Sequence, residues 1–112
     1  MESVRQQKVG RLIQKELSEI FRANSKSMFE GNFISVTIVR VSPDLGQAKV
    51  YLSVMNPGDK SAIVEKVKDL TSPIRHLLGN KIKKQVRVIP ELLFFLDDSL
   101  DYAEKIEKLL KK

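Results

Sequence analysis

The sequence contains no cysteine, which excludes disulfides and thiolate metal sites from its 112 residues. That absence suits a reducing compartment, and we expect a cytoplasmic protein. The single histidine, His76, argues against a metal centre built from histidines. There is no glycine-rich phosphate loop, and no serine lies in the context of a nucleophile elbow. The sequence therefore predicts a protein that is not an enzyme, with no catalytic residue, metal, cofactor or small-molecule substrate.

Long apolar runs are also missing. No stretch approaches the roughly 20 apolar residues that a membrane-spanning helix needs. Charges are spread through the first residues, without the apolar run and cleavage site of a signal peptide. Apolar residues make up 42% and charged residues 30%, a balance typical of globular proteins. We predict a single domain, residues 1–112, with no membrane partner.

Acidic residues are absent from one long stretch, Leu70 to Pro90. It carries five basic residues, whereas the next block, Glu91 to Glu104, carries five acids and no base. A concentrated positive field suits a polyanion, because each neutralised phosphate releases condensed counterions. A solvated charged face is the simpler interpretation, and charge alone does not decide between the two. The basic residues are Arg75, Lys81, Lys83, Lys84 and Arg87.

Helical periodicity is clear in the first segment, which predicts a helix from an N-cap at Ser3 to an end at Asn24. The apolar face comprises Val9, Leu12, Ile13, Leu17, Ile20 and Phe21, and the opposite face carries Lys8, Arg11, Lys15 and Arg22. Residues 25–32 are predicted to be a loop. The helix therefore adds a second basic surface.

Alternating apolar residues then predict a β-hairpin with one buried face. Its first strand buries Ile34, Val36 and Ile38, and its second buries Ala48, Val50, Leu52 and Val54. The turn spans residues 42–46, where Pro43 presets φ and Gly46 tolerates a conformation that other residues resist.

A second helical pattern, Ile63 to Leu78, is interrupted at Thr71-Ser72-Pro73. This predicts two short helices joined at a kink, with Ser72 as the N-cap and Pro73 at the first helical position. A last strand is expected over about Gln85 to Leu96, followed by a helix that starts at residues 97–99. The order is α-β-β-α-kink-α-β plus a C-terminal helix, which predicts an α+β, single type II KH-like domain with a three-stranded sheet. KH domains bind RNA at the junction of two helices, which here is Leu70-Thr71-Ser72 and lacks the GxxG loop.

Several side chains are open to two interpretations. His76 is equally consistent with a contact to phosphate or a base and with an exposed or partly packed helical position. At least one of Phe94 and Phe95 is expected in the core instead of on a base-stacking platform. The acidic residues Asp97, Asp98 and Asp101 are expected to begin a helix rather than to bind a cation.

Three stretches, found in order, resemble the ribosome-binding factor A family. The first is the hairpin Val36 to Tyr51, with its serine, Asp44-Leu45 and Ala48-Lys49-Val50-Tyr51. The second is Ile74-Arg75-His76-Leu77-Leu78-Gly79, and the third is the run from Arg87 through Pro90-Glu91-Leu92 to Leu100. The similarity runs nearly end to end. Members of the family carry an Ala-x-Gly kink where this sequence has Leu70-Thr71-Ser72.

The resemblance implies a ribosome-binding factor for late maturation of the small (30S) subunit. Its expected partners are 16S rRNA and the free 30S subunit, its expected roles are rRNA processing and cold adaptation, and we expect a monomer off the ribosome. A protein-interaction module using the acidic block and the final helix is the alternative, and a small enzyme has no catalytic residues to support it. The expected RNA-binding residues are Arg75, His76, Lys81, Lys83, Lys84 and Arg87, supported by Arg11, Lys15 and Arg22.

Overall fold

A computed structural model describes residues 2–29, 31–54 and 60–97. The elements are α1 (Val4–Ala23), α2 (Ser25–Phe29), β1 (Ile34–Val41), β2 (Gln47–Val54), α3 (Lys60–Asp69), α4 (Thr71–Ile82) and β3 (Glu91–Leu96). The predicted α+β fold is confirmed, with a three-stranded sheet in the order β1-β2-β3. The helix expected after Asp97 lies outside the described residues, as do Asp98, Asp101 and Tyr102.

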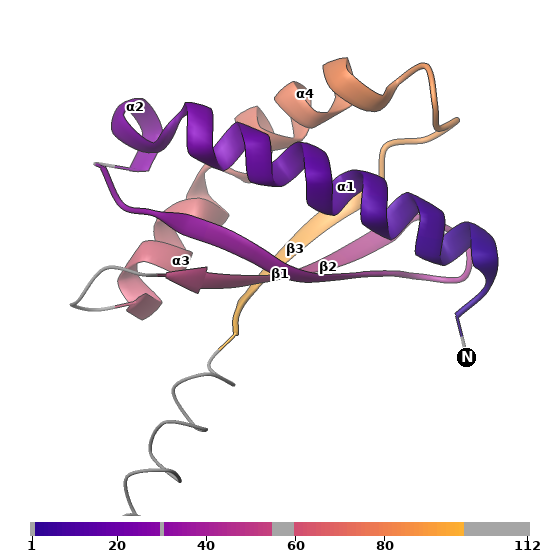
Figure 1. Ribbon diagram of the computed structural model, residues 1–112, viewed down its shortest axis with the longest axis horizontal. Helices are drawn as coiled ribbons and strands as arrows, with labels where there is room; N and C mark the ends of the chain where they lie inside the picture. The colour runs from indigo at the N-terminus through magenta and orange to yellow at the C-terminus, as the bar shows by residue number, and fades with distance from the viewer. Residues whose placement is uncertain (1, 30, 55–59, 98–112) are drawn as a thin grey trace, which may run out of the picture.

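The sheet joins an antiparallel hairpin to one parallel strand. β1 pairs antiparallel with β2, and β2 pairs parallel with β3, Gln47 facing Glu91 and Leu52 facing Leu96. The chain passes from β2 to β3 through α3 and α4, because parallel neighbours need a long crossover. Figure 1 shows α1 and α4 over the same face of the sheet. That face is the one that builds the core.

Helix α1 begins as its sequence predicts. The Ser3 hydroxyl accepts a hydrogen bond from the Gln6 N–H at 3.1 Å, and Gln6 Oε1 accepts one from the Ser3 N–H at 2.7 Å. This is a capping box. Gln6 is also buried, and its Nε2 donates to the Val41 carbonyl at 2.8 Å. The cap therefore fixes the start of α1 against the end of β1.

Close packing of α1 on β1 depends on Gly10. A Cβ at this position would stand 3.1 Å from the Val39 carbonyl oxygen, which is tighter than ordinary contact. Beneath the helix, Ile13, Leu17, Ile20 and Phe21 are buried with Ala48, Val50 and Leu52 of β2. Phe21 contacts two further rings, Phe29 at 5.2 Å and Phe94 at 6.2 Å between centroids. The core is thus built around the C-terminal half of α1.

The hairpin differs from the prediction at two places. The β1–β2 register shifts between Val36 and Ile38, so the alternation of buried and exposed residues reverses and Ile38 is 43% exposed. An extra residue in one strand has this effect because side chains alternate faces. In the turn, Leu45 has the positive φ, 61°, and Gly46 does not. The expectation of a buried Ile38 was therefore wrong, and the turn residue with the left-handed backbone is Leu45 instead of Gly46.

Two boundaries also need correction. Residues 25–29 form α2 where a loop was expected. Residues 85–90 are not strand, because the N–H groups of Gln85 and Val86 donate to the Ile82 carbonyl and continue the end of α4. β3 therefore begins only after Pro90.

None of the helices in the described part of the chain is long and apolar enough to cross a membrane.

Candidate nucleic-acid interface

The kink between α3 and α4 lies at Leu70, two residues earlier than the capping pattern indicates. Leu70 occupies the N-cap position, Thr71 is the first helical residue, and the Ile74 N–H donates to the Leu70 carbonyl at 3.0 Å. No side chain caps this helix, so the predicted N-cap role of Ser72 and the first-position role of Pro73 are wrong. Pro73 is still tolerated, since its missing N–H falls in the first turn, where N–H groups have no partner within the helix.

Ser72 instead lines a surface groove along α4, which we call the α4 groove. The groove is an open hollow of about 460 Å³ between α4 and Ile89, which lies near the end of the segment leading to β3. None of its lining residues is acidic, and most carry hydrogen-bond donors. The lining residues are Ser72, Arg75, His76, Gly79, Asn80, Lys83 and Ile89.

Helical spacing explains why these residues meet. Positions 72, 76, 79 and 83 recur every three or four residues, so they share one face of α4. The opposite face buries Ile74, Leu78 and Ile82 in the core. Sequence reasoning missed Gly79, Asn80 and Ile89 as groove residues, although this periodicity was available for the first two. Ile89 comes from outside the helix, and only the fold places it there.

Arg75 closes one side of the groove. Its Nη2 donates to the Ile89 carbonyl at 2.6 Å and its Nε donates to the Pro90 carbonyl at 3.1 Å. These bonds attach the 83–90 segment to α4 and leave three of the five guanidinium N–H groups for other partners. Arg75 therefore orders the segment as well as contributing charge.

Replacing Arg75 by alanine is expected to lower the free energy of unfolding by about 1.5–3 kcal/mol, the range for hydrogen bonds to charged groups. Arg75→Lys keeps the charge but not the two-pronged geometry, so it should recover only part of the loss. Urea unfolding followed by circular dichroism measures both variants. Equal stability of Arg75→Ala and the parent chain would contradict the assigned structural role.

The other predicted basic residues differ in whether an acidic side chain lies close to their positive charge. Lys83, Lys84 and Arg87 are exposed beyond the last turn of α4, and His76 is exposed on α4 itself. Lys81 differs, because its Nζ lies 3.7 Å from Glu16 Oε2 and 3.9 Å from Glu19 Oε2, both on α1. Its positive charge is therefore partly neutralised within the protein.

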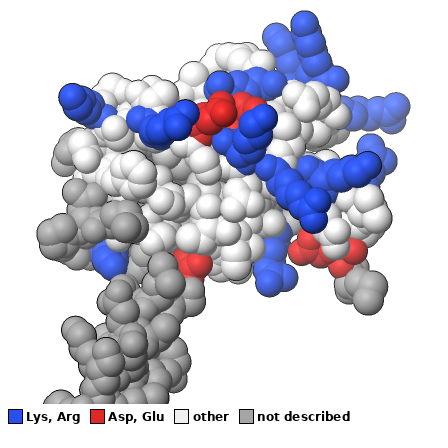
Figure 2. Space-filling model, viewed as in Figure 1, with Lys and Arg blue, Asp and Glu red and all other residues white. Residues whose placement is uncertain are grey.

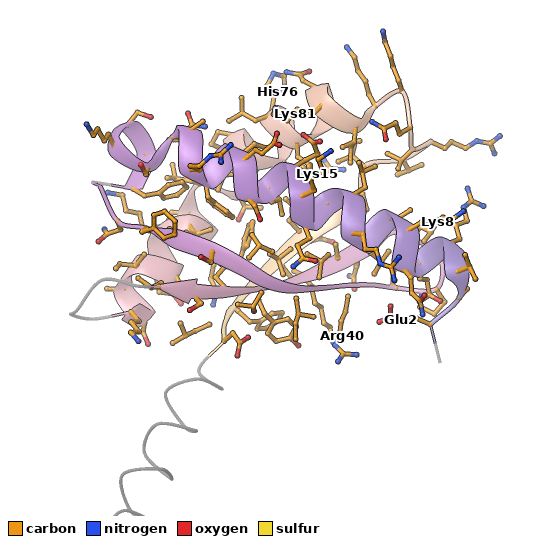
Figure 3. The ribbon with its side chains drawn as sticks, viewed as in Figure 1. Glu2, Lys8, Lys15, Arg40, His76 and Lys81 are labelled. Carbon is orange, nitrogen blue, oxygen red and sulfur yellow. The ribbon has the colours of Figure 1, made fainter. Side chains whose placement is uncertain are left out.

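Helix α1 carries the second basic surface. Arg11, Lys15 and Arg22 are all exposed, and Arg22 lies in the last turn. The rise of 1.5 Å per residue places Arg22 about 16 Å along the axis from Arg11. Figure 2 shows Lys and Arg side chains along the upper edge and the right-hand end of the molecule, with an acidic cluster among those of the upper part and a further acidic patch below those of the right-hand end. In Figure 3, Lys15 on α1 and His76 and Lys81 on α4 lie on the helical side of the sheet, whereas Arg40 points away on the other side.

The two phenylalanines of β3 differ in burial. Phe94 is buried, whereas Phe95 is 39% exposed on the sheet face that α1 and α4 do not cover, which we call the uncovered face with reference to these two helices. Phe95 stacks on Tyr51 with 5.4 Å between ring centroids.

Asp97 accepts a hydrogen bond from Thr37 Oγ1 at 2.6 Å, which ties the end of β3 to β1. No group of three possible metal ligands occurs within the described residues.

Comparison with known proteins gives one consistent result. A sequence model of the family described as ribosome-binding factor A matches residues 5–110. Ribosome-binding factor A of Cytophaga hutchinsonii is 54% identical to this chain, over all of it and 84% of the relative. The crystal structure of ribosome-binding factor A from Thermus thermophilus superposes with a TM-score of 0.68 at 16% identity, over 81% of this chain and 94% of that one.

A further structural match comes from an assembly. It is a homology model of the Thermus thermophilus factor as fitted into a cryo-EM map of the complex of 30S with that factor, with a TM-score of 0.61 at 18% identity. The match covers 78% of this chain and 89% of that one. At these identities the likeness to the two structures supports the fold of this chain and, by itself, nothing beyond it.

Proposed function

This chain belongs to the ribosome-binding factor A family, and from that premise we propose that it binds the free small (30S) ribosomal subunit through 16S rRNA during late subunit maturation. The fitted Thermus thermophilus complex supports the choice of subunit, since that relative is placed on 30S. The proposal extends to efficient processing of 16S rRNA and to growth in the cold. It describes a cytoplasmic, monomeric binding factor with a KH-like fold that acts without catalysis or cofactor.

The α4 groove is the observation that carries the proposal. It combines a concave surface with hydrogen-bond donors from Arg75, His76, Asn80 and Lys83, and none of its described lining residues is an acid. Such donors bind phosphate oxygens and fix the orientation of an RNA strand without reading its sequence. The kink residues Leu70, Thr71 and Ser72 place the first turn of α4, with its positive dipole end, at one end of the groove.

The remaining cations have secondary roles in this proposal. Lys84 and Arg87 extend the positive surface past the groove, and Arg11 and Lys15 extend it across α1. Lys81 contributes less because Glu16 and Glu19 already attract it. Because phosphate contacts do not distinguish sequences, specificity comes from the shape of the folded rRNA.

Sedimentation of cell extract tests the proposal most directly. The protein is expected to travel with free 30S subunits and to be absent from complete ribosomes, and deleting its gene should raise the level of unprocessed 16S precursor. Migration only at the size of the monomer, with normal precursor levels in the deletion strain, would overturn the proposal.

A protein-interaction module is the second candidate function, and one observation favours it. Ile38, Tyr51 and Phe95 lie in register across the three strands on the uncovered sheet face. Salt separates the two functions, because phosphate binding weakens steeply as salt rises and an apolar interface does not. Binding to 30S that is unchanged between about 50 and about 200 mM salt would favour the apolar face.

A further inference from the structure

A second cavity lies at the end of the molecule where the hairpin turn meets α1, and we call it the turn pocket. It encloses about 300 Å³, at the lower end of the range for ligand sites. Its apolar lining comes from three separate parts of the chain. Val9 belongs to α1, Leu45 to the β1–β2 turn, and Val86 and Val88 to the segment before β3.

Leu45 lines this pocket in a costly backbone conformation. Its φ of 61° is the left-handed region, which costs a non-glycine residue about 1–2 kcal/mol. Gly46, the next residue, would adopt that conformation freely, yet the turn places Leu45 there. The turn is held by a hydrogen bond from the Leu45 N–H to the Ser42 carbonyl at 2.9 Å. Strain of this kind occurs where a side chain must occupy a particular position.

Two arginines and one acid are the charged residues of the lining. Arg5 and Arg87 are both exposed and bring positive charge to the pocket. The acid, Asp44, is already engaged, since its Oδ1 accepts from Ser42 Oγ at 2.6 Å and from the Gly46 N–H at 3.0 Å. These two hydrogen bonds, that of Ser42 first, lower the pKa of Asp44. The carboxylate therefore stays ionised and is held within the turn by these two hydrogen bonds.

The turn pocket and the α4 groove share one segment of chain. Lys83 and Ile89 line the groove, and the residues between them, Gln85 to Val88, line the pocket. A strand whose phosphates follow the groove therefore runs beside a segment that also lines the pocket. An apolar cavity flanked by guanidinium groups suits a flat heteroaromatic ring, because guanidinium planes stack on bases.

From this geometry we propose that the turn pocket receives one unstacked base of the RNA strand whose backbone lies in the α4 groove. The proposal rests on the proposed function and adds a base-binding site to it. Val9, Leu45 and Val86 surround the ring, and Arg5 and Arg87 bind the flanking phosphates or stack on the base. An apolar side chain of a ribosomal protein is the competing occupant, and the experiment distinguishes the two.

The test compares two single-stranded RNA hexamers with the same number of phosphates, one with all its bases and one abasic at its two central positions. Fluorescence anisotropy measures the affinity of the full chain for each. The complete hexamer is expected to bind about tenfold more tightly, a difference that corresponds to about 1.4 kcal/mol. Equal affinities would overturn the base-binding proposal.

Leu45→Gly is the informative variant, since it removes one wall of the pocket and also relieves the backbone strain. It is expected to abolish the preference for the complete hexamer while leaving affinity for the abasic one unchanged. Retention of the preference would overturn the proposal. A groove variant, Lys83→Glu with Lys84→Glu, separates the two levels: if it weakens neither hexamer, the proposed function fails, and if it weakens both while Leu45→Gly changes nothing, only the pocket fails.

Amide chemical shifts supply a readout that does not depend on affinity. Adding adenosine monophosphate should move the resonances of Leu45, Val86 and Val88 and leave those of the uncovered sheet face in place. If a leucine-rich peptide moves them and the nucleotide does not, the pocket belongs to a protein partner and the proposal is wrong.

Discussion

Reversing the charge of Lys83 and Lys84 to glutamate is expected to weaken binding to 30S subunits by about 100-fold. At about 6 Å in water, each change replaces an attraction of about 0.7 kcal/mol for a phosphate by a repulsion of the same size, a total of about 1.4 kcal/mol or tenfold per residue. Lys83 lines the α4 groove and Lys84 follows it, and both are exposed. The slope of log affinity against log salt should also become shallower by about 0.7–0.9 for each phosphate that the variant no longer neutralises.

A matched control keeps the change in net charge and moves it elsewhere. Lys26 on α2 and Lys49 on β2 are exposed and line neither the groove nor the turn pocket. The pair Lys26→Glu with Lys49→Glu should bind within about threefold of the parent chain, since only long-range attraction is weakened. Equally weakened binding by the two double variants would mean that net charge alone attracts the RNA, and the groove would not have its assigned role.

For Lys81, on the same surface, we expect only a small effect on RNA affinity. Because Glu16 and Glu19 attract its Nζ, Lys81→Ala removes a charge that is already partly neutralised. Its effect on affinity should be clearly smaller than that of Lys83→Ala. A larger effect would show that RNA binding releases Lys81 from α1.

Phe21→Ala is expected to produce the largest loss of stability, about 3–5 kcal/mol. Phe21 is 1% exposed and joins three elements, because its ring contacts Phe29 of α2 and Phe94 of β3 from the last turn of α1. Domains of this size are stable by only about 5–15 kcal/mol, so a large part of the total is removed. Thermal unfolding followed by circular dichroism should show a fall in Tm of about 10 °C or more.

Two control variants test whether the loss of stability comes from the buried position of the Phe21 ring. Phe21→Leu keeps most of the volume and should cost about 1.5 kcal/mol or less. Phe95→Ala removes the same ring from the uncovered face, where Phe95 is 39% exposed and stacks on Tyr51, and it should cost about 1 kcal/mol. A loss of stability for Phe95→Ala as large as that for Phe21→Ala would mean that the uncovered face is part of the core.

Local patterns were sufficient for the first helix and the strand β2. The Ser3 cap, the apolar face from Val9 to Phe21 and the end at Asn24 were all predicted, because capping and helical periodicity involve residues close in sequence. The same holds for the alternation in β2 and for the existence of a kink near Pro73. Each of these features depends on neighbours within one turn or one strand.

Periodicity failed where pairing between distant segments decides the structure. A register shift opposite Leu52 turns Ile38 outward, and the sequence of β1 carries no sign of it. The start of β3 at Glu91 follows from the start of β2 at Gln47, because the strand has no partner beyond the hairpin turn. The carbonyls of Ile89 and Pro90 accept hydrogen bonds from Arg75 instead of joining the sheet.

The sequence by itself determined that an acid-free, basic stretch lies on a kinked helix pair before the last strand, since composition and periodicity are local properties. Only the tertiary structure decided how its residues act. It pairs Lys81 with carboxylates of α1, uses Arg75 to hold the segment before β3, and gathers Ser72, His76, Asn80 and Lys83 into one groove. It also brings Val9, Leu45 and Val86 together in the turn pocket. The physical reason is that a charge or a cavity depends on which groups lie within a few ångströms, and those neighbours come from remote parts of the chain.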